Sequence, residues 1–552
     1  MKINHAKLTN QTLKVLFYVA FYYSSVVIYL TYSIIDSPDF GKYYRYFEYY
    51  SGNISSLNLE QGHFYYFFNY IIVVASSKIY ELWTLNELLN FSIHLGNSLI
   101  FLVGCVGIRK YLTLYFQKNN IHISLILACL LPASFELRAT FKPEILAFAC
   151  LGWLFYYLHK AGEDNNILAM LKFIILCSFV VTTKVSIAVL VIIILIFEIF
   201  QNKKSFLSHI KKVHIVLLLF CVLSLLIESY SMNGKFITQV DHEAKYDNQA
   251  SFDFMTNFNK DEFIDNPNKY FFYDSFIGIT LFDSFNDFFG FYNNSEHTEL
   301  NKDRKQFFKV VFRGGQVLPI NIKYDKKEAS FTFAGLYDRG WNESNYIDET
   351  RMKLSFVFSS IIYFLCLFIA IFKKRVRPAL LSPFIGMTVV SFSALGLFGT
   401  NNFDPSTGDS FKTFYYGFFI VFAFVVLLQE ILKYNILKRA SALLISLFLL
   451  FFIGFPFAYS QDNAEMLLRK NSIIFSCEIN APAVNILLNL EEEIYCENSS
   501  EVLNIINSEQ QMQLISFEFE NTPYVHIIGV LMYVLLLTPK INKKTSYLEL
   551  LE

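Results

Sequence analysis

Apolar residues in this chain are grouped into long blocks that are separated by short polar segments. A helix needs about 20 mainly apolar residues to cross a bilayer, and a shorter one is accommodated by tilt or local thinning of the bilayer. The pattern predicts twelve spans: Leu13–Ile35, Leu88–Ile108, Ile121–Leu137, Glu144–Leu158, Ile167–Thr183, Val185–Phe200, Val213–Tyr230, Leu354–Phe372, Ala379–Phe398, Lys412–Leu432, Ala440–Tyr459 and Tyr524–Thr538.

Lys and Arg are distributed unevenly between the two sides that these spans define. Alternate connections on one side, together with both termini, hold 21 of them, whereas the short connections on the other side hold four: Arg138, Lys142, Lys184 and Lys412. Cytoplasmic loops carry the excess of positive charge, so both termini are predicted to be cytoplasmic. Counting Phe64–Ser77 as a further span would invert this pattern, so we interpret it as an interfacial or half-buried helix.

The expected fold is an all-α polytopic membrane protein of about 12 transmembrane helices, with extracytoplasmic loop regions of mixed structure. Residues 1–230 form an N-terminal transmembrane module that includes a first extracytoplasmic loop at 36–87. A large extracytoplasmic region follows at 231–353, then C-terminal transmembrane helices at 354–460. A small extracytoplasmic segment at 461–522 precedes the last helix and a cytoplasmic tail at 523–552. The first block is longer than a signal-peptide core and lacks a cleavage site, so we expect a retained anchor.

Composition supports a membrane protein and excludes several other classes. The chain is 54% hydrophobic and only 17% charged, whereas soluble domains carry about 25% charged residues. A net charge of −1 predicts no nucleic-acid partner. Six cysteines lie in apolar blocks, where they act as small hydrophobic residues, and Cys477 and Cys496 lie in a polar segment where they could pair in an oxidising compartment.

Acidic residues follow the first span in the predicted first extracytoplasmic loop. Asp36 and Asp39 lie on either side of a proline and precede two tyrosines. A carboxylate at a membrane boundary can acquire a raised pKa by desolvation and act as a general base, although either aspartate could instead cap the following helix. Glu60 and His63 could bind a polar substrate, or belong to a solvated turn beside an aromatic belt.

The four cations on the predicted extracytoplasmic side lie in very short connections. Arg138, Lys142 and Glu144 flank a predicted turn, and Lys184 lies at the apex of a hairpin with almost no loop. Lys412 begins a late span before Tyr415. Each cation could reach lipid head groups individually, but all four together with the aspartate loop favour a phosphate site.

These motifs resemble the GT-C superfamily of membrane glycosyltransferases, bacterial type. The resemblance is carried by Asp36 and Asp39 after the first span, the Lys142-Pro143-Glu144 turn, Thr183-Lys184, and the start of the late span at Lys412. It implies transfer of a sugar from a polyprenyl-phosphate donor to a glycan, lipid or protein acceptor on the extracytoplasmic face, in the bacterial inner membrane with the site facing the periplasm.

The resemblance also implies roles for individual residues. Asp39, or Asp36, would be catalytic, and Lys142, Arg138, Lys184 and Lys412 would bind the donor phosphate. Substrate-binding residues would be Glu60, His63, Glu144, Tyr43 and Tyr415. The chain has no clear acidic pair of the metal-binding kind, so no cofactor is certain and a requirement for Mg²⁺ or Mn²⁺ is left open.

Two other functions have weaker support in the sequence. Asp39–Asn69 also resembles polymerases of the O-antigen or exopolysaccharide type, which use lipid-linked oligosaccharides as donor and acceptor. A transporter or flippase of lipid-linked sugars would instead show internal repeats, or charges at the bilayer midplane. Neither feature is found, and the polar candidates gather at one predicted surface, as an interfacial enzyme requires.

Overall fold

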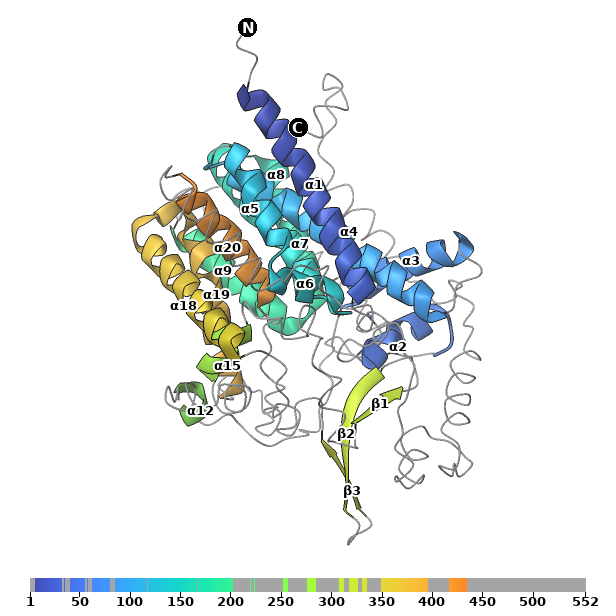
Figure 1. The fold of residues 1–552 in the computed structure, drawn as a ribbon. Helices are drawn as coiled ribbons and strands as arrows, with labels where there is room; N and C mark the ends of the chain where they lie inside the picture. The colour runs from blue at the N-terminus through green and yellow to red at the C-terminus, as the bar shows by residue number, and fades with distance from the viewer. Residues whose placement is uncertain are drawn as a thin grey trace.

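The structure is a computed structural model in which helices predominate (Figure 1). It describes residues 5–31, 34, 40–54, 57, 62–79, 85–116, 118–164, 166–201, 219, 223, 252–256, 276–283, 307–311, 317–325, 330–334, 349–395 and 416–433. The predicted spans at 213–230, 440–459 and 524–538 therefore lie outside the described residues, as do Cys477 and Cys496.

Helices cover most of the described N-terminal module. Their bounds are α1 His5–Thr31, α2 Phe40–Tyr50, α3 His63–Ile79, α4 Leu85–Leu112, α5 Lys118–Cys129, α6 Pro132–Ala139, α7 Glu144–Asp164, α8 Ile167–Thr183 and α9 Val185–Gln201. The predicted spans between residues 13 and 200 each correspond to one of these helices or to the α5–α6 pair, which confirms the helical character of the fold there. Phe64–Ser77 falls in α3, a helix whose first residues are buried within the protein.

Within the described residues, length and composition identify two helical stretches that can cross a membrane, Glu87–Leu112 and Lys374–Ser393. A third is added if the bent pair Ile121–Cys129 and Ala133–Ala139 counts as one span. Four further apolar helices are shorter, with 10–17 residues each. The count of twelve spans and the cytoplasmic position of both termini stay predictions.

One predicted span differs from the structure in shape. The pattern predicted a continuous helix over Ile121–Leu137, but the chain is interrupted after Cys129 and the two parts meet at 75°. Pro132 is the first residue of α6. Proline has no N–H to continue the helical hydrogen bonds and suits the first turn of a new helix. The interruption leaves the short helix α6 beside the turn at 140–143.

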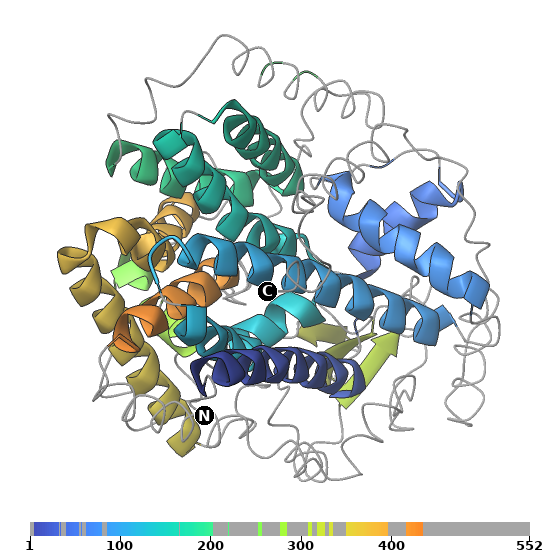
Figure 2. The ribbon, with the colours of Figure 1, turned by 90° about the horizontal axis from the view of Figure 1, so that it is seen from above.

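The later helices are α18 Glu349–Phe372, α19 Arg377–Ala394 and α20 Gly417–Ile431, with the short 3₁₀ helix η4 Lys374–Val376 between α18 and α19. Seen from above, α18, α19 and α20 lie on one side of the bundle and α2 and α3 on the other, with α4 running between them (Figure 2). Helix α20 packs against α5, α6 and α7. Segments far apart in the sequence therefore share one core.

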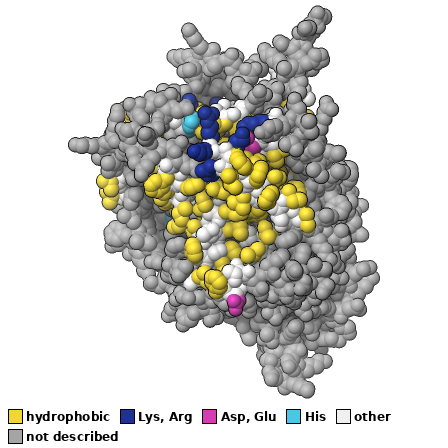
Figure 3. Space-filling view, turned by 90° about the vertical axis from the view of Figure 1, so that its left-hand side faces the viewer, with side chains coloured by type: hydrophobic (Ala, Val, Ile, Leu, Met, Phe, Trp, Pro, Cys, Tyr) yellow, Lys and Arg dark blue, Asp and Glu magenta, His cyan; other side chains and the backbone are white. Residues whose placement is uncertain are grey.

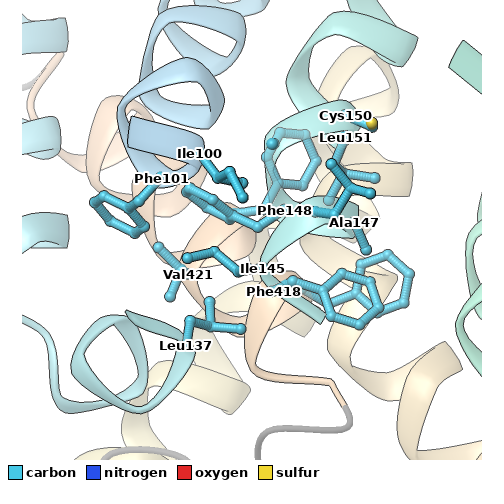
Figure 4. Close-up of a cluster of buried hydrophobic side chains, with 14 of the residues drawn as sticks. Ile100, Phe101, Leu137, Ile145, Ala147, Phe148, Cys150, Leu151, Phe418 and Val421 are labelled. Carbon is cyan, nitrogen blue, oxygen red and sulfur yellow. The ribbon is translucent and has the colours of Figure 1, made fainter. Parts of the chain in front are cut away.

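This core is formed by apolar side chains from four helices. Ile100 and Phe101 of α4, Leu137 of α6, and Phe418 and Val421 of α20 surround the first turns of α7 (Figure 4). All are buried, and the Phe101 ring stacks on that of Phe148 with centroids 4.8 Å apart. The core fixes where α7 begins, and α7 begins at Glu144.

Contacts define two opposite ends of the bundle. At one end, Tyr115 lies 3.2 Å from His159, and the Lys433 ammonium lies 4.4 Å from the Phe116 ring centroid. The turn at 140–143 lies at the other end of α7, where that helix begins. Lys184 lies at this same end, because it directly precedes α9 and contacts Glu144. In the described part of the chain, the basic residues beside these contacts, Lys160 and Lys433, thus lie away from Lys142 and Lys184.

The outer face of α18 is apolar and exposed. Val357, Ile361, Phe364, Phe368 and Ile371 are exposed along it. Figure 3 shows this face as a broad apolar band with Lys and Arg side chains at one end, and exposed Lys373, Lys374 and Arg375 follow α18 in the chain. An apolar surface bounded by basic residues is the expected pattern of a helix facing lipid.

The region between residues 231 and 353 has mixed structure where it is described, as predicted. Two short helices, α12 Phe252–Thr256 and α15 Phe276–Asp283, precede three antiparallel strands, β1 Phe307–Val311, β2 Val317–Asp325 and β3 Ser330–Ala334. The strand order is β1-β2-β3, with Val311 opposite Val317 and Asp325 opposite Ser330. Helix α15 contacts α18, which connects this region to the helical bundle.

Candidate functional site

Three connections that are distant in sequence meet at one end of the bundle. The Gly62 amide donates a hydrogen bond to the Thr183 carbonyl at 2.8 Å, which joins the start of α3 to the α8–α9 hairpin. The Lys184 ammonium lies 3.4 Å from Oε1 of Glu144, which joins that hairpin to the start of α7. The structure therefore brings together the predicted site residues His63, Glu144 and Lys184.

The α8–α9 hairpin has the predicted form. Helix α8 ends at Thr183 and α9 begins at Val185, so Lys184 is the single residue between them. Its backbone is extended, with φ −164° and ψ 137°, far from the helical dihedral angles, so the helix is interrupted at this residue. Lys184 is therefore fixed at the apex, where its side chain reaches the neighbouring turn.

The turn before α7 is held by a buried hydrogen-bond network. Nδ2 of Asn97 donates to the carbonyls of Arg138 and Thr140 at 2.8 and 3.0 Å. The Tyr65 hydroxyl donates to Oδ1 of Asn97 at 2.7 Å. Asn97 thereby joins α4 to the end of α6 and to the turn. The amide satisfies carbonyls that α6 leaves unpaired where it ends, and so positions Lys142.

Lys142 lies in this turn and is almost completely buried, with 2% exposure. Its ammonium lies 5.9 Å from the centroid of the Tyr43 ring, within the range of a cation–π contact. The Phe40 ring lies 5.4 Å from that of Phe141. Helix α2 therefore packs on the Lys142 turn, and Asp39 directly precedes α2 in the sequence.

Glu144 and Lys184 form an asymmetric pair. The Glu144 side chain is 2% exposed, whereas that of Lys184 is 18% exposed. Glu144 is the first residue of α7, where the helix dipole stabilises a negative charge. Burial raises the pKa of the Tyr66 phenol well above 10, with smaller contributions from neighbouring tyrosines and, last, from the Glu144 charge. The carboxylate thus lies close to aromatic residues of α3.

Arg138 lies apart from these groups and is fully buried. Its Nε donates to the Ser134 carbonyl at 3.0 Å, Nη1 to the Ser24 hydroxyl at 2.8 Å, and Nη2 to the Cys129 carbonyl at 2.7 Å. Its guanidinium also lies 4.6 Å from the Phe101 ring centroid. These contacts join α1 to the bend between α5 and α6, so the geometry favours a structural role over the predicted phosphate contact.

His63 begins α3 and is buried among tyrosines. Its Nδ1 lies 3.3 Å from the Tyr50 hydroxyl, and its ring lies edge-on to that of Tyr46 at 5.1 Å. Burial lowers the pKa of His63 to about 3, so the imidazole is neutral at pH 7. A neutral imidazole can exchange hydrogen bonds with a sugar hydroxyl but contributes no charge to a phosphate site.

Five predicted site residues lie outside the described residues: Asp36, Asp39, Glu60, Lys412 and Tyr415. Their predicted roles stay predictions. The neighbour of Tyr415, Tyr416, is buried and donates a hydrogen bond to the Thr280 hydroxyl at 3.0 Å. A Cβ added to Gly417 would lie 3.8 Å from Leu137, so the start of α20 lies beside α6, next to the turn.

No three His, Cys, Asp or Glu side chains are grouped closely enough to hold a metal ion in the part of the chain that the structure describes. The predicted catalytic aspartates lie outside that part, so a requirement for Mg²⁺ or Mn²⁺ stays an open prediction.

Sequence reasoning missed two residues that matter for the site. Tyr65 lies in an aromatic run of the sequence that singles out no one tyrosine, yet its hydroxyl orients Asn97. Ser24 was one of many small residues in the first span, yet it accepts from Arg138. A polar atom in an apolar helix was the available signal for Ser24, but its partner is 114 positions away along the chain.

Comparison with known proteins gives one match. Residues 81–227 match the family described as dolichyl-phosphate-mannose-protein mannosyltransferase. The matched part includes Arg138, Lys142, Glu144 and Lys184, but not the aspartate loop. No curated protein and no solved structure shows significant similarity to the chain. The predicted resemblance is thereby confirmed over residues 81–227: this part of the chain is similar to a family that belongs to the GT-C superfamily of membrane glycosyltransferases.

Proposed function

We propose that this chain transfers a sugar from a polyprenyl-phosphate donor to an acceptor on the extracytoplasmic face of the membrane. One observation carries the proposal. Lys142 and Lys184, two cations in short connections against the charge bias of the protein, lie beside Tyr43 and Glu144 at one end of the helical bundle. Both lysines lie within the part that matches the mannosyltransferase family.

The chemistry requires a base, a cationic site for the leaving group and an apolar surface for the prenyl chain. Asp39 would take the proton of an acceptor hydroxyl, whose oxygen then attacks the anomeric carbon. The bond between that carbon and the phosphate oxygen breaks, and the carrier phosphate leaves with an additional negative charge. Lys142 and Lys184 would stabilise this charge, because preformed cations in a desolvated site act on developing charge more strongly than in water.

The position of Asp39 in the chain supports its assignment. It directly precedes Phe40, and the Phe40 ring packs 5.4 Å from Phe141, the neighbour of Lys142. The first turn of α2, which follows the aspartate loop in the sequence, therefore packs on the Lys142 turn. Lys412 is retained as a third phosphate residue and Glu60 and Tyr415 as substrate residues, whereas Arg138 is left out because its donors are used within the protein.

The test uses the full chain in lipid nanodiscs with a panel of polyprenyl-phosphate monosaccharides. Asp39→Asn is expected to abolish transfer, and Lys142→Met and Lys184→Met to lower kcat by about 10²–10³-fold. Lys172→Met is the matched control, because Lys172 lies in α8 near the opposite end from Lys184 and contacts Tyr157.

Full activity of Asp39→Asn would remove the assignment of the base. An equal fall in kcat for Lys142→Met, Lys184→Met and the control Lys172→Met would contradict the phosphate-binding role of Lys142 and Lys184. A wild-type chain that uses no donor of the panel but extends a lipid-pyrophosphate oligosaccharide would support the polymerase instead.

A further inference from the structure

Glu144 has an unusual environment for a carboxylate. Its Oε1 lies 3.4 Å from the Lys184 ammonium, and its Oε2 is buried without a hydrogen-bond partner among the described residues. Buried polar atoms are nearly always hydrogen-bonded, and an exception calls for an explanation such as a missing ligand. The carboxylate is therefore only partly satisfied within the protein.

The contact with Lys184 is also loose. A charge-assisted hydrogen bond between nitrogen and oxygen is typically about 2.7–2.9 Å long, shorter than the 3.4 Å found here. Glu144 is fixed at the start of α7 and is the more buried partner, whereas the Lys184 side chain is partly exposed on a long flexible stem. The ammonium can thus turn towards a ligand while the carboxylate stays in place.

On the basis of the proposed function, the charges of the donor and of the product explain why the contact between Glu144 and Lys184 is weak. Lys142 and Lys184 carry two positive charges and Glu144 one negative charge. The donor is a phosphodiester with one negative charge, whereas the released polyprenyl phosphate is a monoester with nearly two at pH 7. Without the negative charge of Glu144, the two lysines would therefore favour the product over the donor more strongly, and product release would be slower.

We propose that Glu144 is an exchangeable counter-ion for Lys184. It holds the ammonium while the site is empty, loses it to the phosphate during transfer, and competes for it again so that the polyprenyl phosphate leaves. Glu144 is in this role a positioning residue that acts through Lys184. It sets the affinity for the product and the rate of product release.

The test measures inhibition by polyprenyl phosphate, its direct binding, and kcat for the full chain in nanodiscs. Glu144→Gln removes the charge and keeps the shape, so the dissociation constant and inhibition constant of polyprenyl phosphate are expected to fall about tenfold, the size of a strong coupling between neighbouring charges. At the same time kcat is expected to fall, while a single-turnover measurement of transfer is expected to change little. Glu144→Asp keeps the charge but moves it back by one methylene, so product affinity is expected to lie between those of the wild type and Glu144→Gln.

A double-substitution cycle tests whether Glu144 acts through Lys184. On the Lys184→Met background, Glu144→Gln is expected to leave product affinity unchanged. A merely structural Glu144 would instead give weaker product binding and a lower melting temperature in both backgrounds, and that outcome would overturn the proposal. If Glu144→Gln does not fold, Glu144→Asp decides by the direction of its change in product affinity. A wild-type chain that does not bind polyprenyl phosphate would contradict the proposed function itself. Normal binding by the wild type, with unchanged or weaker binding by the Glu144 variants, would contradict only the counter-ion role of Glu144.

Discussion

The contacts of a cation in space decide its role where the linear sequence gives no ranking. Arg138 and Lys142 are four positions apart, and both are almost fully buried. The contacts of Arg138 run to serine hydroxyls and backbone carbonyls of α1, α5 and α6, whereas Lys142 lies over the Tyr43 ring next to the α7 turn. At this scale, what a charged residue can bind follows from its neighbours in space.

Substitution of Arg138 distinguishes the structural role from a phosphate contact. Arg138→Met is expected to reduce the free energy of unfolding by about 3 kcal/mol, because buried acceptors lose their donors. Arg375→Met, at an exposed arginine after α18, is the matched control and is expected to change stability little. Thermal unfolding in detergent measures both. Unchanged stability of Arg138→Met, with a raised KM for the donor, would restore the phosphate role.

The buried His63 predicts a pH-dependent stability. Its pKa is about 3 in the folded chain and about 6.5 when unfolded. The unfolded state binds more protons between these values, so stability falls as the pH drops below about 6.5. Between pH 7.5 and pH 5 the His63 contribution is about 2 kcal/mol. Over this pH interval, the free energy of unfolding of His63→Asn is therefore expected to fall by about 2 kcal/mol less than that of the wild type. Equal falls would show that His63 does not stay neutral when folded.

Helices α4 and α7 approach each other closely at glycines. A Cβ added to Gly152 would lie within about 3 Å of the backbone of Gly107 and Ile108, and one added to Gly107 would meet the Trp153 ring. Small residues permit such close helix packing in membranes. The position of α7, and with it that of Glu144 at its start, therefore depends on glycines far from the site.

Gly152→Ala is expected to destabilise the fold by about 1–3 kcal/mol, because the two backbones must separate. It is also expected to lower transfer activity, since α7 carries Glu144. Gly386→Ala is the comparison, because an added Cβ there would lie 3.2 Å or more from its neighbours. Melting temperature and activity are the readouts, and a Gly152→Ala chain that matches Gly386→Ala in both would contradict the close packing.

At the scale of the whole molecule, charge and apolar surface are arranged along one axis. Lys and Arg side chains lie at one end of an apolar band (Figure 3), and the lysines of the candidate site lie in the connections where α7 and α9 begin. This arrangement agrees with the predicted membrane orientation.

Cysteine labelling from each side of the membrane tests that orientation. Arg45→Cys and Arg375→Cys introduce thiols at exposed positions of α2 and of the segment between α18 and α19. A membrane-impermeant maleimide is expected to label them from opposite sides in sealed vesicles. The background is a chain in which Cys177, Cys221, Cys477 and Cys496 are replaced by serine, because the other four cysteines, Cys105, Cys129, Cys150 and Cys366, are buried. Labelling of both positions from one side would overturn the assigned topology.

The sequence by itself determined the helical membrane character, most helix positions between residues 13 and 200, the one-residue hairpin at Lys184 and the start of α7. These features depend on apolar length, charge distribution and proline, which act over a few neighbouring residues. Only the tertiary structure decided that α5 and α6 are separate helices, that Arg138 is used internally, and that Lys184 meets Glu144. The physical reason is that burial and hydrogen-bond partners come from residues that are close in space and far apart in the chain, as Ser24 is from Arg138.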